Sequence, residues 1–125
     1  MKTKIYTQHE EHTEWLNKLA FYKDEVPILQ KRIAEVLQKN TSKEVAVKVE
    51  HFQNQLLIQQ DNISKIQHQI NHAENALQNS IKDNPIASGH RKTEDHTAER
   101  EMVEGFEKHF TELRSELNTF ISKWM

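Results

Sequence analysis

Histidine is the residue type with the most chemical potential in this 125-residue chain, which holds eight histidines and no cysteine. Imidazole binds transition metals, and its charge changes close to neutral pH. Most of these histidines fall toward one end of the helical arrangement that is derived below, together with several carboxylates. The members of this group are His9, His12, His68, His72, His90 and His96. They are the strongest candidates for chemistry in the sequence.

A metal site is the first hypothesis for this group. Imidazole and carboxylate together suit Zn, Fe, Ni or Cu, and helical bundles hold such metals between facing helices. The candidate ligands are His9, His12, His72, His96 and Glu99. However, no histidine belongs to a Glu-x-x-His pair, and the segment His-Glu-Glu-His at residues 9–12 is one residue shorter than the zinc motif His-Glu-x-x-His. We therefore expect no metal and no cofactor.

A response to pH is the second hypothesis, since protonation of all eight histidines would change the formal net charge from −2 to +6. Neighbouring carboxylates would stabilise the charged imidazoles and weaken any destabilising effect. The third interpretation is that these histidines are ordinary polar residues at a solvated end of the bundle. We favour this interpretation over both a metal site and a pH response.

Catalysis is not expected, because the sequence offers no loop that could hold a nucleophile and a base together. The two glycines, Gly89 and Gly105, are isolated, so there is no glycine-rich phosphate loop. The 17 basic and 19 acidic residues are mostly interspersed, and no basic stripe alternates with aromatic residues. This composition argues against nucleic acid as a partner.

No apolar run approaches the roughly 20 residues of a membrane span, and the N-terminal segment lacks the apolar core of a signal peptide. The absence of cysteine agrees with a reducing compartment. We therefore expect a cytoplasmic protein that does not contact a membrane.

Three stretches carry apolar side chains spaced by four and three residues, which places each set on one face of an α-helix. Thr7 with Glu10, and Thr41 with Glu44, have the spacing of helix-capping boxes. Pro85 marks the second connection. The predicted helices are residues 8–39, 43–82 and 90–124. The three apolar stripes are Trp15, Leu19, Tyr22, Val26, Leu29, Ile33 and Val36; Val45, Val49, Phe52, Leu56, Ile63, Ile66, Ile70, Ala73 and Leu77; and Val103, Phe106, Phe110, Leu113, Leu117, Phe120 and Trp124.

Short connections between long helices predict an all-α fold: an elongated antiparallel three-helix bundle with coiled-coil-like packing, forming a single domain over residues 1–125. Pro27 lies inside the first helix. Because the apolar stripe keeps its register across it, we expect one helix with a kink near Pro27, the alternative being two shorter helices. Gln59 falls on the second stripe, where it either fixes the register as a buried amide or extends to the edge; we favour the edge.

Four large apolar residues lie off the stripes of the first two helices: Phe21, Ile28, Leu57 and Ile58. Antiparallel pairing about the turn near Thr41 brings the two pairs to similar heights in the bundle. A contiguous exposed apolar patch typically marks an interface. We therefore expect a non-enzymatic structural or protein-interaction bundle that forms a homodimer. The alternative function is a metal- or pH-responsive bundle that uses the histidine cluster.

Overall fold

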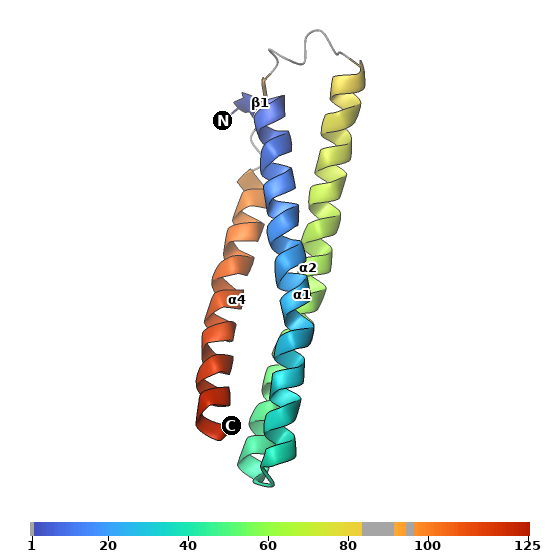
Figure 1. Cartoon of the computed structure of the whole chain (residues 1–125). Helices are drawn as coiled ribbons and strands as arrows, with labels where there is room; N and C mark the ends of the chain where they lie inside the picture. The colour runs from blue at the N-terminus through green and yellow to red at the C-terminus, as the bar shows by residue number, and fades with distance from the viewer. Residues whose placement is uncertain (1, 84–91, 95–96) are drawn as a thin grey trace.

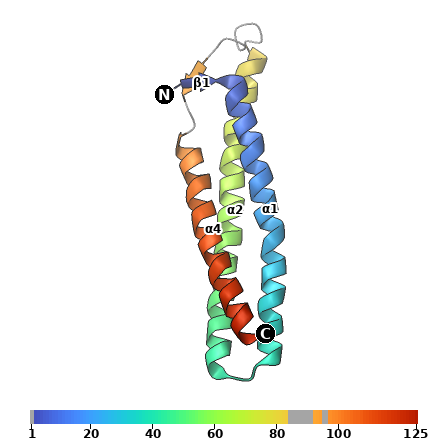
Figure 2. The same cartoon turned by 60° about the vertical axis from the view of Figure 1, so that its left-hand side comes forward.

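The computed structural model describes residues 2–83, 92–94 and 97–125. Three long helices run up, down and up: α1 (Ile5–Lys39), α2 (Lys43–Asp83) and α4 (Thr97–Trp124). The α1–α2 turn and the C-terminus lie at one end of the elongated bundle, and the N-terminus lies at the other (Figure 1, Figure 2). The predicted all-α three-helix bundle is therefore confirmed.

A short ribbon that the sequence did not predict joins the two chain segments at the N-terminal end. Strand β1 (Lys2–Lys4) pairs antiparallel with β2 (Lys92–Glu94), with Thr3 opposite Thr93. The predicted start of the third helix at residue 90 is consequently wrong, since residues 92–94 are extended and α4 begins only at Thr97. Such a pairing rests on backbone hydrogen bonds and leaves no periodic apolar signal in the sequence.

Helix α1 begins at Ile5, directly after β1, so that Thr7 lies inside the helix and is not its N-cap. The capping box predicted at Thr7 and Glu10 is therefore wrong. The helix continues through Pro27, which excludes the alternative of two shorter helices. Pro27 lies on an exposed face, where its missing N–H and its ring disturb no packing of the core. The kink at this position stays a prediction.

The turn between α1 and α2 is as short as predicted, and polar groups of the turn satisfy the helix ends. Ala46 N–H donates to the carbonyl oxygen of Ser42 at 3.1 Å, so Ser42 occupies the N-cap position that the sequence assigned to Thr41. The Asn40 amide donates to the carbonyl oxygens of Val36, at 2.8 Å, and of Trp124, at 2.9 Å. Asn40 thus fastens the last turn of α4 to the α1–α2 turn.

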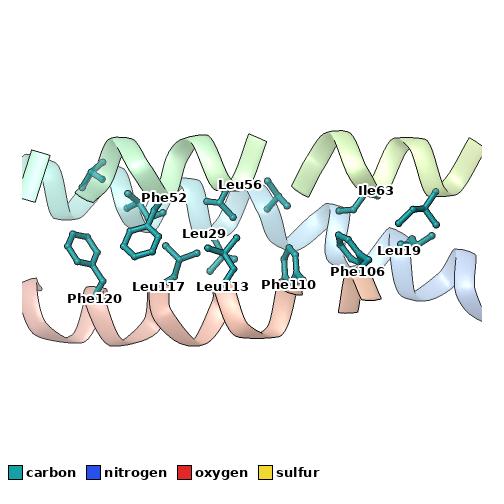
Figure 3. Packing of buried hydrophobic residues seen from close by; sticks show 14 of the residues in the cluster. Leu19, Leu29, Phe52, Leu56, Ile63, Phe106, Phe110, Leu113, Leu117 and Phe120 are labelled. Carbon is teal, nitrogen blue, oxygen red and sulfur yellow. The ribbon is translucent and has the colours of Figure 1, made fainter. Parts of the chain in front are cut away.

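The apolar stripes of all three helices meet in one continuous core (Figure 3). Leu19, Ile33, Leu56, Ile63 and Phe110 are completely buried. Each large apolar side chain that is fully buried stabilises the folded state by about 1.5–3 kcal/mol, so this core is the main source of stability. Three stripe residues are only partly buried, namely Tyr22, Ala73 and Trp124. Gln59 is buried at 8% exposure, so the preference for an edge position is wrong.

Three ion pairs at a regular spacing join α1 to α4 along one side of the described bundle. Glu11 pairs with Arg100 at 2.8 Å, Lys18 with Glu107 at 3.3 Å, and Glu25 with Arg114 at 2.6 Å. Partners in each pair are 89 residues apart, and successive pairs are separated by seven residues on both helices. The constant offset reflects two parallel helices in register, with charged side chains beside the core as at the flanking positions of heptad repeats.

Candidate functional site

The predicted histidine end of the bundle contains a compact polar network centred on Glu74 of α2. Nδ1 of His9 lies 2.7 Å from one carboxylate oxygen of Glu74, and Nδ1 of His12 lies 2.8 Å from the other. Gln78, one turn further along α2, donates its amide N–H to Glu74 at 2.6 Å. One carboxylate therefore accepts hydrogen bonds from side chains of two helices.

Burial differs strongly among the members of this network. His12 is only 1% exposed and packs its ring 5.7 Å from that of Trp15, whereas the side chain of His9 is 45% exposed. His12 thus points inward, as the backward extension of the first apolar stripe predicts. A buried imidazole needs polar partners, and the Glu74 carboxylate is one of them.

The network also controls the charge of Glu74. Burial alone would raise the pKa of this carboxyl, but the hydrogen bonds from Gln78, His12 and His9 outweigh burial and lower the pKa below its ordinary value. Glu74 is therefore ionised at neutral pH and can only accept hydrogen bonds. Consequently Nδ1 carries the proton in both imidazoles.

The candidate metal ligands are not brought together in the part of the chain that the structure describes. His72 is exposed on α2, Glu99 lies in the first turn of α4, and His96 falls outside the described residues. Among the described residues, no group of three or more histidine, aspartate or glutamate side chains is arranged to hold a metal ion. His9 and His12 instead share Glu74, a carboxylate that the sequence places at this end but that was not among the candidate ligands.

A simple count places Glu74 close to the height of His9 but does not single it out. Moving equal distances from the α1–α2 turn, backwards along α1 and forwards along α2, sets residues 9–12 opposite residues 70–73, next to Glu74. The count gives the height of each residue in the bundle but not the rotation of each helix about its axis. That rotation is what directs Glu74, rather than the neighbouring His72, toward α1.

The four predicted interface residues are all exposed, between 50% for Ile58 and 66% for Phe21. Phe21 lines a shallow cleft of about 320 Å³ between α1 and α4, beside Tyr22 and Glu107. Ile28 follows it seven residues later and continues the same stripe along α1. Leu57 and Ile58 are consecutive, so their side chains project about 100° apart around α2.

Comparisons with protein-family models, with curated proteins and with solved structures find no match to this chain. No described helix combines the length and the apolar character that crossing a membrane would require.

Proposed function

We propose that this chain is a non-enzymatic protein-interaction bundle that self-associates through the apolar side chains Phe21, Ile28, Leu57 and Ile58. The observation that carries the proposal is that the core is complete without them. Nineteen apolar residues of the described part of the chain form the buried cluster, and none of these four belongs to it. Since each of these apolar side chains is at least half exposed, which is unfavourable in water, a second surface that covers them supplies a reason for their presence.

The alternative is a proton-responsive or metal-responsive bundle, and the geometry of the histidine network favours it less. Both imidazoles donate Nδ1–H to an ionised carboxylate, a contact available to the neutral and the protonated ring alike. Protonation of His9 or His12 therefore breaks none of the hydrogen bonds to Glu74. The network fits a role in joining α1 to α2 better than a role as a switch.

Sedimentation velocity at protein concentrations of about 10–100 μM tests the proposal, since this range detects dimers of micromolar affinity. We expect the unaltered chain to sediment as a dimer. The pairs Phe21→Ser with Ile28→Ser and Leu57→Ser with Ile58→Ser should each shift it toward the monomer. Because all four side chains are exposed, the changes should alter folding stability by no more than about 0.5 kcal/mol each.

Leu37→Ser is the matched control, because Leu37 is also exposed on α1, at 41%, but lies nearer the α1–α2 turn. It should leave the dimer intact. An unaltered chain that sediments as a monomer at every concentration would refute the proposed function. A dimer that neither double variant shifts toward the monomer would refute it as well.

A further inference from the structure

A groove with a volume of about 740 Å³ lies between α2 and α4, near the C-terminus. Phe52, Phe120 and Trp124 form its apolar floor, and Val47, which is 59% exposed, forms part of its wall. Cavities that bind small molecules have volumes of about 300–1,000 Å³ and are mostly apolar with a few polar groups. The groove therefore has the size and lining of a small-molecule site.

The polar side chains that line this groove are two lysines, one histidine, one carboxylate and the hydroxyls of Ser115 and Thr119. Lys48 reaches it from α2 and Lys123 from α4. Lys48 approaches Glu44 of its own helix only at 4.0 Å, and Lys123 makes no ion pair with any described residue but lies 5.3 Å from the centre of the Trp124 ring. Glu116 is the one carboxylate in the lining, and His51 completes the rim.

Trp124 lines the groove with its ring. Its indole N–H is buried and has no hydrogen-bond acceptor among the residues that the structure describes. An atom that is closed to solvent is equally closed to a molecule in the groove, so the two lysines are the groups that would hold an anion there. The α1–α4 flank offers a contrast, because there the cations are paired with Glu11, Glu25 and Glu107.

From this lining we infer that the groove binds an amphipathic monocarboxylate, a molecule of the fatty-acid class with an apolar body and a single anionic end. The apolar body would cover the aromatic floor, while the carboxylate would accept hydrogen bonds from the two lysines. Glu116 disfavours ligands that carry several negative charges, such as nucleotides. None of the four residues of the proposed dimer surface lines the groove, so this inference does not depend on the proposed function.

Calorimetric titration of the full chain with three probes of equal chain length tests the assignment: decanoate, 1-decanol and decylammonium, each below its aggregation concentration. We expect saturable binding of one decanoate per chain. Decanoate should bind about tenfold tighter than the alcohol, the equivalent of one charge-assisted hydrogen bond, and decylammonium should bind weakest. Equal affinity for decanoate and 1-decanol, or no saturable binding of decanoate, would overturn the inference even without any variant.

The double variant Lys48→Gln with Lys123→Gln should reduce the affinity for decanoate to that for 1-decanol. Lys82→Gln with Lys108→Gln is the control, since it removes one exposed lysine from each of the same helices outside the groove. An equal loss in the control would show that only the overall charge matters, and would overturn the site.

The chain contains two tryptophans, Trp15 and Trp124. In the variant Trp15→Phe all tryptophan emission comes from Trp124, so fluorescence shows whether the ligand binds next to that residue. Decanoate should shift the Trp124 emission along the same saturation curve as the calorimetric signal. An emission that changes with protein concentration alone would indicate that a second copy of the chain fills the groove, and would count against the ligand.

Discussion

The ion pair between Arg114 and Glu25 should contribute measurably to stability, unlike a typical surface pair. Two nitrogens of the guanidinium bind the two carboxylate oxygens, each at 2.6 Å. The side chains are only 30% and 17% exposed, and the guanidinium carbon lies 5.6 Å from the Tyr22 ring centre and 5.3 Å from that of Phe110. The hydrogen bonds to Glu25 raise the pKa of Arg114 above its ordinary value.

The expected magnitude follows from these contacts. A hydrogen-bonded charged pair contributes about 1.5–3 kcal/mol when buried, and partial exposure reduces this to about 1–2 kcal/mol for the coupling between the two side chains. The two aromatic rings add about 0.5–1 kcal/mol each to the cost of removing the guanidinium. Arg114→Ala should therefore lower the free energy of unfolding by about 2–4 kcal/mol, and Glu25→Ala by somewhat less.

A double-mutant cycle measured by urea unfolding isolates the coupling energy of the pair. Lys18 with Glu107 is the matched control on the same flank, since its nitrogen and oxygen are 3.3 Å apart and its side chains are 45% and 29% exposed. The control pair should give a coupling of about 0.5 kcal/mol or less, and 1 M salt should weaken it further. A coupling for Arg114 with Glu25 no larger than that of the control would refute the reasoning.

Three further changes test other parts of the structure by urea unfolding. Glu74→Gln should lower the free energy of unfolding by about 1–2 kcal/mol at pH 7. Because the pKa of Glu74 in the folded state lies below its ordinary 4.5, this stabilisation is complete above pH 4.5 and is lost as the pH falls through the folded-state pKa. A difference in unfolding free energy between the unaltered chain and the variant that stays the same at pH 3 would contradict the network. Pro27→Ala should raise stability by about 1–3 kcal/mol, as an exposed proline inside a continuous helix loses one hydrogen bond; a loss would indicate that the local bend is needed. Gln59→Leu should raise stability by about 1–2 kcal/mol, because its buried carbonyl oxygen has no partner among the described residues, and lower stability would show that the amide serves packing.

The helices and the core could be predicted because burial leaves a periodic trace in the sequence. Val36 and Val45 lie on either side of the α1–α2 turn, and both were assigned to the core and are completely buried. The start of α4 could not be predicted in the same way. It depends on backbone pairing between two segments 90 residues apart, Lys2–Lys4 and Lys92–Glu94, whose side chains have no apolar alternation.

The candidate site was predicted only in part, for a different physical reason. Composition and topology were sufficient to predict that most of the histidines lie toward one end of the bundle. The apolar repeat was sufficient to predict that His12 points inward. The partner of His12 could not be read from these patterns, because it depends on the rotation of α2 relative to α1. The same limit applies to Gln59, whose position on the stripe was clear although its burial was not.

The two flanks of α4 differ in a way that bears on function. Toward α1, charges of opposite sign alternate along the helix and meet their partners, as at Glu107 and Arg114. Toward α2, Lys123 faces a groove that also contains Lys48, and no ion pair joins α2 to α4 among the described residues. Since the ion pairs and the core already hold α4 in place, the lysines of the groove can be exchanged with little loss of stability. Their removal should therefore affect what the groove binds more than how the bundle folds.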